Sequence, residues 1–312
     1  MDKICFHGIM HFSDRDGNRV NSKAHSGGEL FDLYIRNAVV LALTLKRHGY
    51  GFILHTNNTA LCGELLDEEG RALVGVREIE AHYSPPEDIK FYSAHQKLNL
   101  YRTLAGEVGN VHCVVDLDMV MLKKLPDWLG DIWNRGLGAV YDISCQVLPS
   151  VGHERVRSDL ARLTGFSSEG RWFGGEFISG TPAFWAKLCA RIESYWPAYL
   201  ANYQGLSHQG DEALSSAAFQ VLGHADIIAV DVGTFDVVKR HWSVCTHHQQ
   251  PSLCGYMDKI SMLHLPADKP FIASCGLADF NDDNAQFWRR YKAENRKRRF
   301  LSVAKHMLKP KK

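Results

Sequence analysis

Two carboxylates separated by one residue follow an apolar run at residues 111–115. Asp116 and Asp118 flank Leu117, and in an extended chain the side chains of alternate residues project to the same side. An apolar run bounded by polar segments predicts a buried strand, and open α/β sheets bind ligands at the C-terminal ends of their strands. Carboxylate oxygens suit Mg²⁺ or Mn²⁺, and a metal held by two side chains keeps positions open for phosphates. The pair therefore predicts a divalent metal site that handles a diphosphate.

The chain before this pair has the pattern of a β-α-β unit. Residues 4–12, 50–58 and 74–79 have the apolar character of strands. Ser26 and Glu29 have the spacing of a helix capping box, and apolar residues then recur at helical spacing as far as residue 49. Strands joined through a helix in this order predict a parallel sheet. We therefore expect an α/β fold with a mixed, mainly parallel sheet flanked by helices.

The segments after residue 90 continue this alternation. A second capping box, formed by Ser93 and Gln96, predicts a helix that ends at residue 106. The apolar pattern further predicts strands at 138–142, at 227–230 and within 259–270, and helices within 150–170, at 182–199 and at 211–221. Residues 172–180 contain too many glycines for a regular element throughout. From residue 231 to about residue 260 the pattern favours no element.

Composition excludes several classes of protein. With 312 residues, 45% of them hydrophobic and 23% charged, the chain can bury the core of one large α/β domain, and we expect a single catalytic unit. No window approaches eighteen consecutive apolar residues, and the N-terminus lacks the order of a signal peptide. The eight cysteines include no C-x-x-C pair, which argues against a zinc ribbon and against a disulfide framework. We therefore expect a cytoplasmic protein with reduced thiols.

The charge of the chain is unevenly distributed. Residues 281–312 contain eleven Lys or Arg against three acidic residues, a net charge of +8. Because the whole chain is at +1, residues 1–280 carry −7. Aromatic and aliphatic residues among these cations favour an amphipathic tail on an anionic membrane surface, through residues 287–312. The acidic body argues against nucleic acid as a partner. We expect a catalytic domain at 1–280, a basic amphipathic tail at 281–312, and peripheral attachment to the inner face of the cytoplasmic membrane.

The two carboxylates after a strand, and four further segments described below, resemble motifs of nucleotide-sugar-dependent glycosyltransferases of the Rossmann-like GT-A fold. Asp116-Leu-Asp118 matches their D-x-D motif, and Lys97-Leu98 resembles a basic residue followed by Leu in glycosyltransferase family 8, which commonly has Arg there. Residues 264–270 resemble that family's H-x-x-G-x-x-K-P, in which His binds the metal and Lys the diphosphate. Here the interval from His264 to Lys269 is one residue short and the central glycine is missing.

Two further segments carry the resemblance. Residues 172–176 are similar to the W-G-G-E region of other GT-A enzymes, which implies that the backbone of Gly174 and Gly175 approaches the donor and that Glu176 meets the sugar or the acceptor. Residues 209–214 resemble the D-Q-D-x-L segment of family 8. Asp211 and Glu212 are then candidates for the general base on the acceptor or for the carboxylate that stabilises an oxocarbenium-like centre. The likeness of residues 172–176 is to inverting families and that of residues 264–270 is to a retaining one, and we favour retention.

The resemblance implies a hexosyltransferase-type enzyme. It would transfer a sugar from a nucleotide-diphosphate donor such as a UDP-sugar to a glycan or glycolipid, for example in lipopolysaccharide or capsule biosynthesis. The implied site has Asp116, Asp118 and His264 as ligands of Mn²⁺ or Mg²⁺, with Lys97, Asp116, Gly174, Gly175 and Lys269 around the donor. Two alternatives stay open: a haloacid-dehalogenase-type phosphatase that uses Asp116 and Asp118, whose D-x-D-x-V pattern fits, and a catalytically inert membrane-associated binding protein of the same fold.

Overall fold

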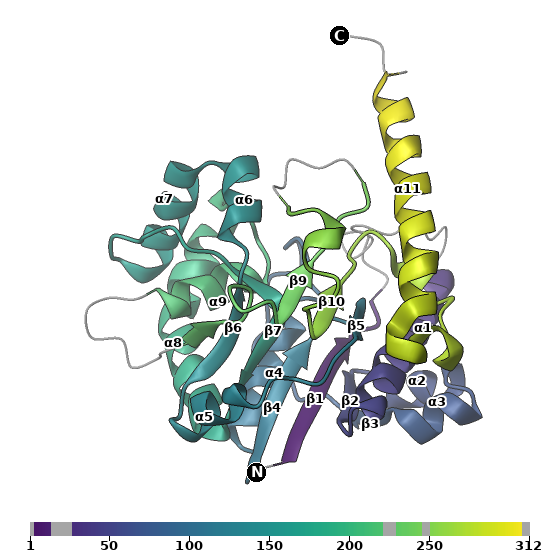
Figure 1. Ribbon diagram of the computed structural model, residues 1–312. Coiled ribbons are helices and arrows are strands. Elements are labelled where there is room, and N and C mark those ends of the chain that lie inside the picture. The colour runs from purple at the N-terminus through teal and green to yellow at the C-terminus, as the bar shows by residue number, and fades with distance from the viewer. Residues whose placement is uncertain (1–2, 14–26, 221–228, 245–249, 308–312) are drawn as a thin grey trace.

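The computed structural model describes residues 3–13, 27–220, 229–244 and 250–307, and is built around two sheets (Figure 1). The larger sheet has the order β3-β2-β1-β4-β7-β6-β8, and the smaller one has the order β5-β10-β9. The strands are β1 (Lys3–Met10), β2 (Gly51–Thr56), β3 (Gly75–Glu78), β4 (Asn110–Val115), β5 (Met119–Met121), β6 (Gly138–Asp142), β7 (Phe173–Gly180), β8 (Ala229–Asp231), β9 (Val238–Arg240) and β10 (Met262–His264).

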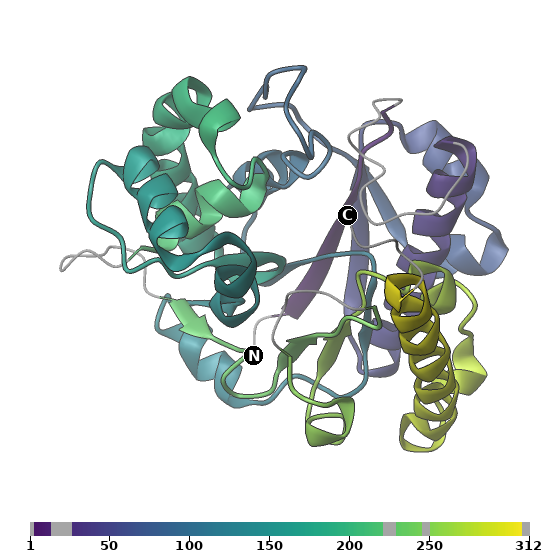
Figure 2. The same cartoon turned by 90° about the horizontal axis from the view of Figure 1, so that it is seen from above.

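Helices cover both sides of the larger sheet. They are α1 (Gly27–Arg47), α2 (Thr59–Leu65), α3 (Glu68–Leu73), α4 (Gln96–Ala105), α5 (Trp128–Asn134), α6 (Ser144–Val151), α7 (His153–Thr164), α8 (Pro182–Asn202), α9 (Asp211–Phe219), α10 (Lys269–Ile272) and α11 (Ala285–Met307). In the view from above, α1 to α3 and α6 to α9 lie on opposite sides of the strands (Figure 2). None of the helices in the described ranges is both long enough and apolar enough to cross a membrane.

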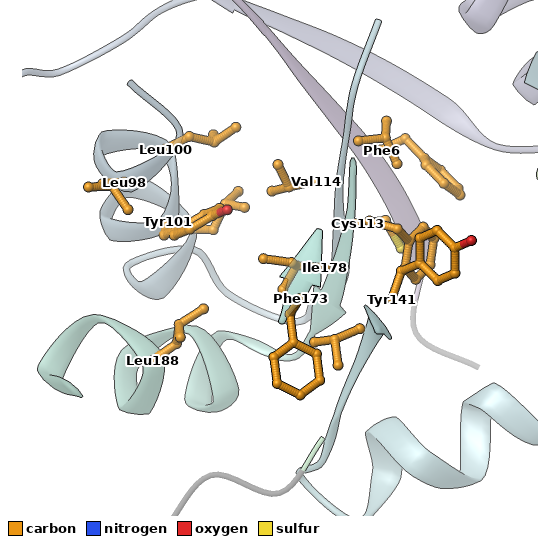
Figure 3. Close-up of a cluster of buried hydrophobic side chains, with 14 of the residues drawn as sticks. Phe6, Leu98, Leu100, Tyr101, Cys113, Val114, Tyr141, Phe173, Ile178 and Leu188 are labelled. Carbon is orange, nitrogen blue, oxygen red and sulfur yellow. The ribbon is translucent and has the colours of Figure 1, made fainter. Parts of the chain in front are cut away.

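The larger sheet is mixed and mainly parallel, which confirms the predicted fold class. β1 pairs in parallel with β2 and β4, β2 with β3, and β6 with β8. Only β7, among the described strands of this sheet, runs antiparallel to its neighbours, β4 and β6. Figure 3 shows the main core on the two faces of this sheet. Val114 and Ile178 lie toward Leu98 of α4 and Leu188 of α8, whereas Phe6 lies on the other side.

The prediction for residues 172–180 was wrong, because this glycine-rich segment is the fully buried strand β7. A central strand has neighbours on both faces, and small residues fit where those neighbours approach closely. A Cβ on Gly180 would lie 2.3 Å from the Phe184 ring, so the glycine there is required by packing rather than by a turn. The partner strands β4 and β6 hold the segment extended despite its low strand propensity.

The predicted capping box before α4 was also wrong. The helix begins at Gln96, and its N-cap His95 makes no side-chain capping hydrogen bond. Residues 91–95 form a tight turn instead, in which the N–H of Ala94 donates to the Phe91 carbonyl at 2.9 Å. The first box involves Ser26, which lies outside the described residues, as do residues 227–228 of the predicted strand and residue 221 of the predicted helix. The predicted 150–170 segment contains α7 and the end of α6, separated at Gly152.

The smaller sheet brings the C-terminal part of the chain to the end of β4. β10 pairs antiparallel with β5, which directly follows the two carboxylates, and His264 lies opposite Met119. The N–H of Leu265 donates to the carbonyl of Asp118 at 3.0 Å. This register places residues from the far end of the chain beside the D-x-D motif.

A second hydrophobic core lies under α11. Phe287 and Tyr291 of this helix are fully buried against Phe271, Phe280 and their neighbours. Farther along the helix, large apolar side chains are exposed, and in Figure 1 the C-terminal end of α11 extends past the rest of the described chain. Helix α11 therefore has a buried first part and an exposed last part, and the domain boundary at residue 281 stays a prediction.

Candidate active site

A cavity of about 450 Å³ opens at the C-terminal ends of β1 and β4. Seven of the residues predicted from the sequence line it: Lys97, Asp116, Asp118, Asp211, Glu212, His264 and Lys269. The three other predicted site residues, Gly174, Gly175 and Glu176, lie behind this lining on β7. The fold thus brings together side chains from positions 97 to 269, at the sheet edge where open α/β folds bind their ligands.

Three potential metal ligands meet in this cavity. Asp116, Asp118 and His264 each offer a ligand atom, and these atoms all lie within 4.8 Å of one another. His264 Nε2 is 3.1 Å from Asp118 Oδ1 and 3.7 Å from Asp116 Oδ2. Two carboxylates and one imidazole form a donor set that Mg²⁺, Mn²⁺ and related divalent cations accept. The residues present therefore fit the expected metal.

The pKa values in this cluster are set by its opposite charges. Burial opposes ionisation of Asp118, yet the Lys269 ammonium at 2.6 Å and the His264 imidazole hold the pKa of Asp118 well below its usual range. Burial alone would lower the pKa of His264, but the Asp118 carboxylate and hydrogen bonds to Asp118 and Glu176 raise it to about 9. The imidazole must lose its proton before it can bind a metal, so a metal would displace a proton here.

Two buried lysines flank the three potential metal ligands. Lys269 Nζ lies 2.6 Å from Asp118 Oδ2 and donates to the Pro266 carbonyl at 2.9 Å. Lys97 Nζ lies 2.5 Å from Asp116 Oδ1 and 3.7 Å from Asp211 Oδ2, and donates to the Gly175 carbonyl at 2.9 Å. Burial disfavours both ammonium groups, but the adjacent carboxylates hold the pKa of each lysine above its ordinary value. Both lysines are therefore charged, although their side chains are largely buried.

Asp211 is the carboxylate in this cavity that is least compensated by positive charge. Burial raises its pKa to about 7, although Lys97 opposes this shift. Within the described residues, Asp211 Oδ2 accepts no hydrogen bond. A carboxylate with a pKa near 7 is suited to accept a proton at neutral pH.

Gly174 and Gly175 make room for charged side chains. A Cβ on Gly174 would lie 1.8 Å from Glu176 Oε2. A Cβ on Gly175 would lie 2.7 Å from Asp211 Oδ2 and 2.9 Å from Lys97 Nζ. Any larger residue would displace these groups, so the two glycines shape the site from behind its lining. Close approach of their backbone to a donor stays a prediction.

Arg240 is a site residue that was not predicted from the sequence. It ends the short strand β9, lines the cavity, and binds both oxygens of Glu176 through Nε at 2.6 Å and Nη2 at 2.7 Å. Its Nη2 also contacts Glu212 Oε1 at 3.3 Å. Burial opposes ionisation of Glu176, but Arg240 holds the pKa of that carboxyl below its usual range. Two acidic residues near an expected active site imply a counterion, and this was the one available signal for Arg240.

The two glutamates have different surroundings. Glu176 is fully buried behind His264, whose Nδ1 lies 3.3 Å from its Oε1, so it orients the imidazole as a second carboxylate often does beside a ligating histidine. Glu212 reaches the cavity and accepts hydrogen bonds from Trp172 Nε1 at 3.0 Å and from the N–H of Gly175 at 3.3 Å. His208 lies near Glu212 and does not belong to the group of three potential metal ligands.

Comparison with known proteins supports the fold. No protein-family model and no curated protein matches the sequence. Among solved structures, the WbbM bifunctional glycosyltransferase matches 96% of this chain and 52% of its own, with a TM-score of 0.50 and 13% identity. This chain has a glycosyltransferase fold. It spans about half the length of WbbM.

Two other glycosyltransferase structures show a similar degree of likeness. The galactosyltransferase LgtC, in complex with donor and acceptor sugar analogues, matches 90% of this chain and 95% of its own, with a TM-score of 0.49 and 11% identity. Mouse xyloside xylosyltransferase 1 matches 83% of this chain and 97% of its own, with a TM-score of 0.48 and 13% identity. At identities of 11–13%, these likenesses say nothing about substrates or mechanism.

Proposed function

We propose that this protein is a metal-dependent glycosyltransferase that moves a sugar from a nucleotide-diphosphate donor, a UDP-sugar, to a glycan or glycolipid acceptor. The observation that carries the proposal is the joint placement of Asp116, Asp118 and His264 with Lys97 and Lys269 in one cavity of a glycosyltransferase fold. The donor's leaving group departs with about two negative charges, and this set of residues can neutralise them.

On the donor side, Asp116, Asp118 and His264 would hold Mn²⁺ or Mg²⁺. When bound, such an ion supplies a Lewis acid that neutralises charge on the departing diphosphate. Lys269 lies 2.6 Å from Asp118 and would contact the phosphates beside the ion. Lys97 holds Asp116 in place and ties it to the Gly175 carbonyl. Because these cations are already oriented by their partners, little reorganisation is needed when charge develops.

On the acceptor side, Asp211 and Glu212 would act on the incoming hydroxyl and on the sugar. The bond between the anomeric carbon and the diphosphate oxygen breaks, a bond from the acceptor oxygen to that carbon forms, and the hydroxyl proton leaves. A pKa of about 7 suits Asp211 to take this proton. Glu212 is ionised and faces the cavity, where a carboxylate can stabilise an oxocarbenium-like centre. We favour retention of the anomeric configuration, on the likeness to family 8.

The proposal includes a glycan or glycolipid acceptor at a membrane surface, such as a bacterial surface polysaccharide under construction. The exposed last part of α11 supports this with apolar side chains exposed among cations: Phe300, Leu301 and Val303 beside Arg296, Lys297 and Arg299. Apolar insertion combined with attraction to anionic lipid favours attachment to the inner face of a cytoplasmic membrane.

Nucleotide binding tests this function directly. Calorimetric titration of the protein with UDP and with a panel of UDP-sugars, with and without Mn²⁺, should show metal-dependent binding. Incubation with the UDP-sugar that binds should release UDP by slow hydrolysis. Asp118→Ala should abolish both, whereas Asp131→Ala, which removes an exposed carboxylate on α5, should change neither. If no nucleotide binds under either condition, the proposed function is wrong.

A further inference from the structure

Helix α11 contacts two of the chain segments that bring cations to the cavity. Residues 240–243 include Arg240, and residues 264–269 include His264 and Lys269. Each segment faces the cavity on one side and meets α11 on the other. His241 Nε2 lies 3.5 Å from Asn295 Oδ1, and the second segment makes much stronger contacts. The helix therefore touches the back of the site rather than a remote surface.

The stronger contacts converge on Asp268, a fully buried carboxylate. Ser243 Oγ donates to its Oδ1 at 2.6 Å, and the Tyr291 hydroxyl donates to its Oδ2 at 2.9 Å. The Arg298 guanidinium lies 3.1 Å from Oδ1 through Nε. We call Ser243, Asp268, Tyr291 and Arg298 the α11 clamp. Two hydroxyl donors and this ion pair fix the position of the buried carboxylate, although the Arg298 Nε–H itself donates to Glu294 Oε1 at 2.7 Å. Breaking any of these contacts leaves a buried charge with less compensation.

The clamp also fixes the backbone that carries Lys269. Arg298 Nη1 donates to the Ala267 carbonyl at 2.6 Å. The N–H groups of Phe271 and Ile272, in the first turn of α10, donate to the Asp268 carbonyl at 2.9 Å and 3.1 Å. Lys269 is the next residue, and its Nζ reaches Asp118 Oδ2 at 2.6 Å. Two adjacent residues thus have different partners: Asp268 contacts α11, and Lys269 contacts Asp118, one of the potential metal ligands.

We propose that Asp268 is a positioning residue through which α11 holds Lys269 against the donor site. The role of Lys269 toward a diphosphate rests on the proposed function, whereas the placement of Lys269 by the clamp does not. An ammonium on a four-carbon stem loses much rotamer freedom when it is held in one place. A fixed backbone on its N-terminal side reduces the number of positions that it can adopt, so Lys269 stays preorganised for phosphate.

The placement can be tested without any ligand. Acetic anhydride labelling followed by peptide mass spectrometry gives the rate at which Lys269, a buried amine, is acetylated. Asp268→Asn and the milder Tyr291→Phe should raise this rate about tenfold, because each loses a hydrogen bond to a charged group. Arg290→Met is the matched control, since Arg290 lies on the same helix and binds Asp279 and Ser274 instead. Equal Lys269 rates in wild type and Tyr291→Phe would overturn the proposal.

The consequence for the donor site is tested with UDP and Mn²⁺. Asp268→Asn should raise the UDP dissociation constant about tenfold, and Lys269→Met should do so to a similar extent. If Asp268 acts through Lys269, adding Asp268→Asn to Lys269→Met should change the constant less than about twofold, since coupled residues are not additive. Additive effects would overturn the proposal. If the wild-type protein binds no UDP, the proposed function fails, and the labelling rates still decide whether the clamp places Lys269.

Discussion

Replacing Arg240 should destabilise the protein far more than the loss of a surface ion pair. Arg240 binds both oxygens of Glu176, at 2.6 Å and 2.7 Å, and the Glu176 side chain has 0% exposure. In Arg240→Met this buried carboxylate would keep, among the described residues, the contact with His264 Nδ1 at 3.3 Å. Breaking a buried ion pair from one side costs about 3–5 kcal/mol, against about 0–1 kcal/mol for an exposed pair. We expect the free energy of unfolding to fall by about 3–5 kcal/mol.

Replacing Glu176 should lower the free energy of unfolding less than replacing Arg240 does. In Glu176→Gln the guanidinium keeps Glu212 at 3.3 Å and still meets a neutral amide oxygen, so about 1–3 kcal/mol is expected. In the double variant no buried carboxylate is left unpaired, and the total loss should be smaller than the sum of the two single losses. This non-additivity distinguishes a lost ion pair from a general packing defect.

Urea denaturation at pH 7, followed by circular dichroism, measures these free energies. Arg102→Met is the control, because Arg102 and Glu193 form a pair whose side chains are 46% and 45% exposed. Its loss should stay below about 1 kcal/mol. If Arg240→Met destabilises the protein no more than Arg102→Met does, the buried Glu176 carboxylate does not depend on Arg240.

Three further predictions concern pH, packing and catalysis. His7 is hydrogen-bonded to His55 and His112, and burial with neighbouring positive groups lowers the pKa of all three histidines, that of His55 to about 4. The free energy of unfolding should therefore be highest above about pH 6.5 and should fall at lower pH, by about 1.4 kcal/mol per pH unit for each histidine that stays neutral in the folded protein. Urea unfolding measures this fall, which should be weaker in His7→Leu. Gly175→Ala should reduce kcat about 100-fold, since its Cβ would lie 2.7 Å from Asp211 Oδ2, and an unchanged kcat would contradict that crowding. Asp211→Asn should lower kcat by about 10²–10⁴ with a modest change in donor KM, measured in steady-state transfer assays, and equal loss of donor binding would exclude a role as base.

Local patterns were sufficient for much of the fold. The strand before Asp116, the strand at 138–142 and the helix from Pro182 were predictable, because periodicity and capping residues act within a few positions. The strand β7 was missed, because its extended form depends on β4 and β6 on either side. Glycine there leaves room for neighbouring side chains, and the three glycines offset the strand preference of Phe173, Phe177 and Ile178.

In the candidate site, too, the residues with a local sequence pattern were predictable and the residue without one was not. Asp116 and Asp118 stand out by their spacing, and the structure brings His264 to them as the motif implied. Arg240 comes from a segment without a pattern, and its function depends on Glu176, 64 positions away. Nothing within a few residues of Arg240 indicates that contact. Such pairs arise only from tertiary packing, so they are invisible to an argument from local sequence.

The antiparallel pairing of β10 with β5 also bears on the order in which the site is assembled. His264 meets Asp118 across 146 positions of sequence, so loop closure over this distance precedes the contact, and such non-local contacts form slowly. A growing chain that has not yet reached β10 can already pair Asp116 with Lys97, but it holds Asp118 without the imidazole and the ammonium that compensate it. Both positive groups reach Asp118 when the late segment docks. These opposite charges thus favour closure of the smaller sheet, and the candidate site is assembled only after residues 262–269 have been synthesised.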